Sequence, residues 1–305
     1  MIDVLLLVLG IAVVVAGAEI FFDGLLALSA RLKTAPFVVT ALISGFELEN
    51  IAAGIAANAK DLPGAAAGTF LGGTTFLALG VTGLAAIIRP LEARLPWKPL
   101  AAAAASPLAL VLVSLDRSLS RVDGAILIAW FIAVMIVLAR TGKDIVAPSA
   151  DDDDEKSKPA LRLLGGLAAL TVGGEVLGEG IRATVSRFGV SQTLLGNTVI
   201  AASVEAEEIG RVAVPARRGR GDVALGNIIG TVAHFIAFNA GVVALVRPLA
   251  LDRTTMNLHL PVAAISVPIV CLLLIGRKRI SRRGGALLVV AYIAYIAVAI
   301  AGALD

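Results

Sequence analysis

The sequence predicts an all-α membrane protein whose ten transmembrane helices form two inverted five-helix repeats. Three observations lead to this fold class: the composition, the number of apolar stretches and an internal repeat. Of the 305 residues, 58% are hydrophobic and only 16% are charged, and the mean hydropathy is +0.92. This composition is typical of a bilayer-embedded protein and argues against a water-soluble globule of this size.

Ten apolar stretches, separated by turns rich in charged residues, proline or glycine, account for nearly the whole chain. A helix needs about 20 apolar residues to cross about 30 Å of hydrocarbon. The stretches cover residues 4–30, 36–59, 64–88, 100–115, 124–138, 161–185, 193–214, 223–246, 258–275 and 286–301. The first has no basic segment before it and no cleavage site after it, so we expect a retained helix rather than a signal peptide.

The basic residues predict how these helices are oriented. With ten spans, 19 of the 26 Lys and Arg residues, Arg211 among them, fall in turns on one side of the membrane. The positive-inside rule then places residues 141–159 in the cytoplasm and both termini outside a cell membrane. Topology therefore explains the pI near 9.2, and a nucleic acid partner is not expected. The lipid bilayer is the expected partner, and the sequence does not determine the oligomeric state.

The long central loop divides the chain into three parts. Residues 1–140 are the first five-helix repeat, residues 141–159 a cytoplasmic acidic linker, and residues 160–305 the second repeat. The linker contains four aspartates and a glutamate in a row, at residues 151–155. A regulatory cation site is one interpretation of this run. A solvated linker is the preferred one, because the run lacks the glycine and the spaced ligands of a calcium loop.

The internal repeat emerges when the two halves are compared at an offset of 158 residues. Residues 43–51, ISGFELENI, align with residues 201–209, AASVEAEEI, and residues 66–73, AAGTFLGG, align with residues 224–231, ALGNIIGT. Because each half contains an odd number of spans, the second copy must enter the membrane in the opposite orientation. In transporters built this way, corresponding spans of the two halves form the substrate site near the midplane.

Five glutamates lie about halfway along the two spans that carry the first pair of blocks. They are Glu47, Glu49, Glu205, Glu207 and Glu208. An ionised carboxylate in hydrocarbon costs on the order of a few kcal/mol even on permissive insertion scales. We therefore expect these side chains to face the protein interior and to hold a cation or a proton.

Helical spacing sorts these carboxylates, because residues three or four apart share a face. Glu47 and Asn50 share one face of span 36–59, and Glu205 and Glu208 share the equivalent face of span 193–214. The two faces together present three carboxylates and an amide oxygen. Such an oxygen-only set suits a hard cation, for example Ca²⁺, Na⁺ or Mg²⁺.

The remaining polar residues of this region have less certain roles. Glu49 and Glu207 project to other faces, and Arg211 four residues after Glu207 indicates a structural ion pair. Glu49 is left as a ligand, a proton carrier or a structural residue. Asn227 and Thr231, on span 223–246, are either further ligands or hydrogen-bonding residues between helices.

These blocks resemble the motifs of the cation/calcium exchanger superfamily, of the sodium/calcium antiporter type. In that family each half carries G-T-S-L-P-E followed by G-N-x-x-G-S-N. Residues 45–50 and 203–208 occupy the first motif, residues 226–231 match the second well, and residues 68–73 match it loosely. The family's motif glutamate is retained as Glu208 but replaced by Asn50 in the first half. The resemblance implies the ten-span fold, transported inorganic cations and no cofactor.

The sequence therefore predicts a secondary antiporter rather than an enzyme. It would exchange a divalent cation, Ca²⁺ by resemblance, for Na⁺ or H⁺ at a midplane carboxylate site by alternating access. The predicted ligands are Glu47, Asn50, Glu205, Glu208, Glu49, Asn227 and Thr231. Two alternatives stay open: an intramembrane metal-dependent enzyme that uses paired glutamates, and a cation channel. Counter-ion dependence of the flux separates the antiporter from the channel.

Overall fold

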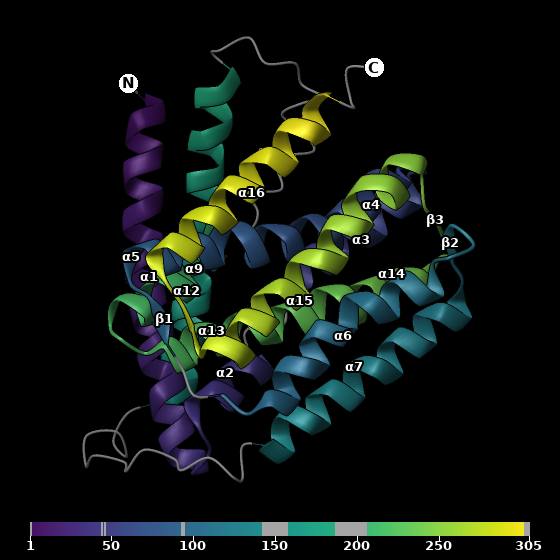
Figure 1. The fold of residues 1–305 in the computed structure, drawn as a ribbon. Helices are drawn as coiled ribbons and strands as arrows, with labels where there is room; N and C mark the ends of the chain where they lie inside the picture. Colours follow the sequence, from purple (N-terminus) through teal and green to yellow (C-terminus); the bar gives the residue numbers. More distant parts are fainter. Residues whose placement is uncertain are drawn as a thin grey trace.

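The computed structural model describes residues 2–43, 45, 47–92, 95–141, 158–186 and 206–301, which are almost entirely helical (Figure 1). In the first half the elements are α1 (Ile2–Leu32), α2 (Pro36–Ile43), α3 (Leu48–Ala59), α4 (Pro63–Thr75), η1 (Phe76–Val81), α5 (Thr82–Ile88), β1 (Leu91–Glu92), α6 (Trp97–Val113), β2 (Ser118–Leu119) and α7 (Arg121–Thr141). In the second half they are α9 (Pro159–Ser186), α12 (Ala206–Arg217), α13 (Gly221–Ala233), η4 (His234–Asn239), α14 (Ala240–Val246), β3 (Leu249–Ala250), η5 (Thr255–His259), α15 (Leu260–Arg277), β4 (Arg279–Ile280) and α16 (Arg282–Ala301).

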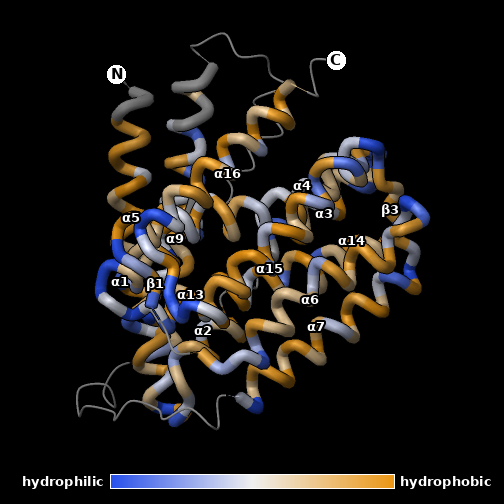
Figure 2. The backbone as a smooth tube through the Cα atoms, viewed as in Figure 1, coloured by the Kyte–Doolittle hydropathy of each residue, from blue (hydrophilic) through white to orange (hydrophobic). Residues whose placement is uncertain are grey.

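Long apolar helices dominate this fold, as the composition predicts. Among the described residues, seven are long and apolar enough to cross a membrane: Leu5–Leu32, Pro63–Ile88, Arg121–Thr141, Pro159–Gly180, Gly221–Val246, Thr255–Arg277 and Arg282–Ala301. Trp97–Val113 is a shorter apolar helix. Hydrophobic residues run along the helices and hydrophilic ones gather at the turns (Figure 2). Leucines that are mostly exposed, such as Leu112 and Leu287, are placed to face lipid.

The internal repeat is visible in the backbone. The continuous unit α4–η1–α5 covers residues 63–88, and α13–η4–α14 covers residues 221–246, with every boundary shifted by 158 residues. Both units contain a six-residue π-helical segment, and both end at an arginine in extended conformation, Arg89 and Arg247. π-Helical segments are rare and local, so their recurrence at the same offset supports a common ancestral unit.

Helices α1 and α9, which the repeat relates to each other, lie side by side and antiparallel (Figure 1). A Cβ atom on Gly10 would lie 2.5 Å from the backbone nitrogen of Leu177, and one on Gly24 would lie 2.9 Å from that of Leu163. The sequence order of these contacts is opposite on the two helices. Because glycine lacks a Cβ atom, the two backbones approach closely along the whole interface.

The other contacts between the halves are reciprocal. Helix α5 packs against α16, while its repeat equivalent α14 packs against α7. Strand β1 pairs with β4, and β2 pairs with β3, both antiparallel. The Arg89 Nη1 atom donates to the Arg217 carbonyl at 3.2 Å, and Arg247 donates in the same way to the Ala59 carbonyl, also at 3.2 Å. The contacts between the repeats are therefore repeated down to single hydrogen bonds.

The predicted continuous helix over residues 36–59 is wrong. Helix α2 ends at Ile43 and α3 begins at Leu48, with Glu47 in extended conformation at φ −105° and ψ 95°. The predicted span 193–214 is described only from Ala206, where α12 begins. The acidic run at residues 151–155 lies outside the described residues.

Candidate cation site

The break between α2 and α3 lies against α13, and glycines make this approach possible. A Cβ atom on Gly226 would lie 2.5 Å from the Phe37 carbonyl oxygen, and one on Gly230 would overlap the Ala41 backbone. Gly45, in the break itself, faces His234 and the Thr231 backbone with no room for a side chain. This packing brings the polar residues of α13 next to the start of α3.

Three carboxylates lie at the starts of two helices that meet here. Glu47 is the residue before α3, and Glu207 and Glu208 lie in the first turn of α12. A helix N-terminus carries partial positive charge, which stabilises an adjacent carboxylate. The Asn50 side chain donates from Nδ2 to Glu47 Oε2 at 2.6 Å. The predicted contact between Glu47 and Asn50 is thus confirmed, but it lies at the start of α3 rather than on one face of a continuous helix.

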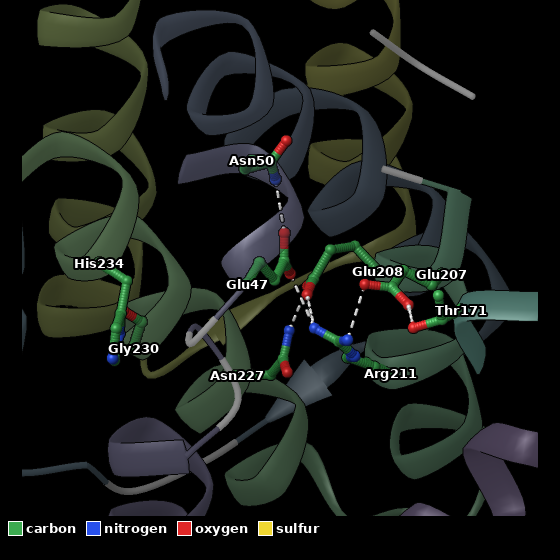
Figure 3. A network of polar contacts seen from close by, with 9 residues as sticks. All are labelled: Glu47, Asn50, Thr171, Glu207, Glu208, Arg211, Asn227, Gly230 and His234. Atoms are coloured by element: carbon green, nitrogen blue, oxygen red, sulfur yellow. Dashed lines mark hydrogen bonds and ion pairs between the residues drawn. The ribbon is translucent and has the colours of Figure 1, made fainter. Parts of the chain in front are cut away.

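A single guanidinium joins all three carboxylates (Figure 3). The Arg211 Nη1 atom lies 2.7 Å from Glu47 Oε1 and 2.7 Å from Glu208 Oε1, and Nη2 lies 2.7 Å from Glu207 Oε1. Arg211 is 4% exposed, Glu207 5%, Glu208 0% and Glu47 8%. Short, charge-assisted bonds of this kind are needed to hold charges that are removed from water.

Helix α13 adds an amide and a hydroxyl to the cluster. Asn227 Nδ2 donates to Glu208 Oε2. The Asn227 Oδ1 atom and the Thr231 Oγ1 atom, one turn apart on α13, have no hydrogen-bond partner among the described residues, and both residues are 0% exposed. Buried polar atoms without partners are rare in native proteins and call for an explanation such as an ion or a water molecule.

The structure brings together four of the seven predicted ligands, Glu47, Asn50, Glu208 and Asn227, and Thr231 lies one helical turn from Asn227. Glu205 lies outside the described residues. Glu49 is exposed and is not part of the network in Figure 3. The predicted ion pair between Glu207 and Arg211 is confirmed, at 2.7 Å.

Two expectations about this region are wrong. The cluster is not an oxygen-only set, because the Arg211 guanidinium lies at its centre. Arg211 is also not in an exposed turn, since it is buried within α12. In the described part of the chain, no group of three or more His, Cys, Asp or Glu side chains is arranged to hold a metal ion.

The sequence did contain the signal that places Arg211 here. Arg211 follows Glu208 by three residues and Glu207 by four, which are the two helical spacings that bring side chains together. Counting Arg211 as a turn residue assigned it to the membrane surface. Its contact with Glu47, 164 residues away, depends on how α12 packs against the start of α3 and could not be read from spacing.

His234 lies beside the cluster and has a packing role. Its Nδ1 atom is 2.8 Å from the Gly230 carbonyl oxygen, and its ring packs edge-on against Phe131 with 4.7 Å between centroids. The backbone hydrogen bond and the aromatic contact fix the ring between α13 and α7.

Comparisons with known proteins agree on the family. The family described as "Sodium/calcium exchanger protein" matches residues 2–140 and 158–301. The chain is 26% identical to CaxA of Alkalimonas amylolytica, provisionally named an antiporter, over 94% of this chain and 95% of that protein. It is 25% identical to the inner membrane protein YrbG of Escherichia coli K12, over 96% and 95% of the two chains.

A structure of the sodium-calcium exchanger NCX_Mj, soaked with Na⁺ and Sr²⁺, superposes with a TM-score of 0.83. The match has 23% sequence identity and covers 97% of each chain, so it establishes the shared fold. The matched family, CaxA and NCX_Mj are named as exchangers or antiporters rather than enzymes, and the hypothesis of an intramembrane enzyme is set aside. The chain belongs to the sodium/calcium exchanger family of membrane proteins.

Proposed function

We propose that the protein is a secondary antiporter that exchanges a divalent cation, Ca²⁺, for Na⁺ or H⁺ at the cluster around Glu47 and Glu208. One observation carries this proposal. Glu47 from the first repeat and Glu208 from the second bind the same positively charged atom, the Nη1 of Arg211, at 2.7 Å each. The contact of both halves with one buried guanidinium supports a shared site for a cation.

The charges and oxygens of the cluster support a transported cation as its other occupant. Three carboxylates and one guanidinium leave two negative charges uncompensated when all four groups are ionised. A divalent cation, or protons, would balance that charge. Asn227, which binds Glu208, and Thr231, one turn further along α13, offer two neutral oxygens, in keeping with the ligands that Ca²⁺ prefers.

The remaining predicted ligands extend this site. Glu205 is proposed as a further carboxylate of the cluster, one turn before Glu208 in the sequence. Glu49 is exposed, and we assign it to the path by which the cation reaches the cluster. No nucleic acid and no resident cofactor take part in this mechanism; its partners are inorganic cations and the bilayer.

Alternating access follows from the pseudosymmetry if the ten spans form two inverted units, residues 1–140 and 160–305. The antiparallel contact of α1 with α9 and the reciprocal helix contacts support this arrangement. Helices α1 and α9 cover α12, whereas Glu49, Ala52 and Ala53 on α3 are exposed. Such asymmetry is expected of one state of a two-state transporter. In the proposed orientation both termini lie outside and the linker 141–159 is cytoplasmic.

Calcium flux into proteoliposomes tests the proposal. Glu208→Gln and Glu47→Gln each remove one charge from the cluster, and each should lower ⁴⁵Ca²⁺ flux at least about tenfold. Glu92→Gln is the matched control, because Glu92 is an exposed glutamate 63% accessible at the surface, and it should keep the parent flux. Flux in Glu47→Gln and Glu208→Gln equal to that of Glu92→Gln would refute the assignment.

The counter-ion is identified in the same vesicles, with calcium inside and a Na⁺, K⁺ or proton gradient imposed in turn. Exchange predicts that one of these gradients accelerates calcium efflux and that its reversal drives calcium uptake. Flux that is insensitive to every gradient would indicate a channel instead.

A further inference from the structure

The cluster contains a cation of its own, covalently attached to the helix that supplies two of its carboxylates. Arg211 Nη1 bridges Glu47 and Glu208, while Nη2 binds Glu207 separately, four residues earlier on α12. The contacts of the guanidinium with described carboxylates are therefore of two kinds. One spans the two repeats at the site itself, and the other lies within a single helix.

The first repeat has no arginine at the equivalent position. The equivalent position of the first repeat, 158 residues earlier, is Ala53, which is exposed on α3. Glu208 has Asn50 as its equivalent. The second repeat therefore contains an additional carboxylate and an additional guanidinium together, three residues apart on α12 and in contact at 2.7 Å. Their net charge is zero, as it is for Asn50 and Ala53.

We infer that Arg211 is a tethered counter-cation that occupies the Glu47–Glu208 pair whenever the transported cation is absent. The inference rests on the proposed function of this site. When a divalent cation binds Glu47 and Glu208, the Nη1 contacts are released, and the pair with Glu207 retains the side chain on α12. Glu207 is thus the anchor of Arg211, and Glu47 and Glu208 are the positions that it vacates.

A tethered counter-cation would change how many monovalent cations are exchanged for each divalent cation. A carboxylate pair that has lost its divalent cation cannot change its exposure across the membrane until another positive charge enters, because uncompensated charges are costly in low dielectric. In an antiporter the incoming monovalent cations supply that charge. Here Arg211 supplies part of it, so each transported divalent cation is exchanged for one monovalent cation fewer than the carboxylates alone would require.

The test is the coupling ratio, measured from the reversal potential of ⁴⁵Ca²⁺ flux in phosphatidylethanolamine and phosphatidylglycerol vesicles at clamped voltage and pH. Arg211→Gln should raise by one the number of monovalent cations exchanged per Ca²⁺. It should also raise the apparent affinity for Ca²⁺ by about tenfold or more, since a buried competitor has been removed. Arg211→Lys retains the charge and should keep the parent ratio.

The failure of this inference is distinguishable from the failure of the proposed function. If Glu208→Gln abolishes flux but Arg211→Gln keeps the parent ratio and affinity, only the tethered cation is wrong. If the parent moves no Ca²⁺ under any gradient, and Glu208→Gln matches Glu92→Gln, the proposed function itself is wrong.

If Arg211→Gln folds poorly, its thermal unfolding in the presence of cations still tests the inference. The inference requires that external cations substitute for the guanidinium, so Na⁺ or Ca²⁺ should raise the thermal unfolding temperature of this variant more than that of the parent. A variant that no cation stabilises would contradict the inference, because Arg211 would then be a structural residue only.

Discussion

Helices α3 and α12 are copies of one another, yet they have different chemistry at the centre of the molecule. In α12, Glu208 and Arg211 are buried and bonded to each other at 2.7 Å. In α3 the equivalent residues are Asn50, which is buried, and Ala53, which is exposed. An ion pair in one repeat thus replaces an amide and a methyl group in the other, with no change in net charge.

Packing against other helices explains why α12, the repeat copy with the buried charges, is the more buried of the two. Helices α1 and α9 pack against α12, so Glu207 is 5% exposed, whereas its equivalent in α3, Glu49, is exposed. Buried charges must be compensated, and exposed ones need not be. The comparison teaches that the two repeats share a backbone frame but differ in burial and in charged residues at equivalent positions.

Removal of Arg211 alone should have the largest effect on stability. Arg211→Ala leaves three buried carboxylates without their shared partner, which should lower the free energy of unfolding by about 3–5 kcal/mol in cation-free detergent solution. The double variant Glu208→Asn with Arg211→Ala copies the first repeat and should recover part of that loss, because it removes both charges. Additive losses in thermal unfolding of the single and double variants would show that the two residues are not coupled.

The next largest effect on stability is expected at a pair of equivalent glycines, one in each repeat. A methyl group at Gly226 would lie 2.5 Å from the Phe37 carbonyl oxygen, while one at its equivalent Gly68 meets no atom within 4 Å. Gly226→Ala should therefore destabilise by about 1–3 kcal/mol through forced separation of α13 from α2. Gly68→Ala should be neutral or stabilise by up to about 1 kcal/mol through helix propensity. Equal unfolding temperatures for the two variants would show that the contact with α2 is not tight.

Smaller effects on stability and calcium binding are expected at two threonines. The Thr74 hydroxyl of α4 donates to the Phe70 carbonyl at 2.7 Å, whereas that of Thr231 has no partner among the described residues. Thr74→Val should cost about 0.5–1.5 kcal/mol and leave calcium affinity unchanged. Thr231→Val should cost nothing in cation-free protein but weaken calcium binding, measured by titration calorimetry. Unchanged binding in Thr231→Val would remove this hydroxyl from the proposed ligands.

The smallest effect is expected at the end of α12. Arg218 pairs with Glu19 and, at 2.8 Å, with Asp23, both on α1, but its side chain is 39% exposed. Solvent screens such pairs, so Arg218→Met should change the free energy of unfolding by about 1 kcal/mol or less. Destabilisation as large as that of Arg211→Ala would mean that burial does not distinguish the two arginines.

Much of the fold could be predicted from the sequence because a bilayer imposes strong constraints on it. Apolar length marks the helices, and the offset of 158 residues recurs in the backbone at every boundary of α4–η1–α5 and α13–η4–α14. The break at Glu47 could not be predicted, since residues 36–59 contain only one glycine before it and no proline after residue 36. Backbone breaks of this kind depend on the partner that receives them, here α13.

Of the carboxylates predicted as ligands, Glu47 and Glu208 lie in the candidate site, whereas the guanidinium at its centre was not predicted there. Spacing was sufficient to pair Glu47 with Asn50, and Glu207 with Arg211, because both pairs are local. The contacts of Arg211 with Glu47 and of Asn227 with Glu208 join different elements. They are set by the tertiary packing of α12 and α13 around the start of α3, which no helical period reveals.

The most direct test of this account is a structure of the protein saturated with Sr²⁺, located by its anomalous scattering. We predict an ion between the carboxylates of Glu47 and Glu208, close to Asn227 and Thr231, with Arg211 Nη1 withdrawn from both carboxylates and Nη2 still on Glu207. An ion found elsewhere, with Arg211 still bridging Glu47 and Glu208, would contradict the account.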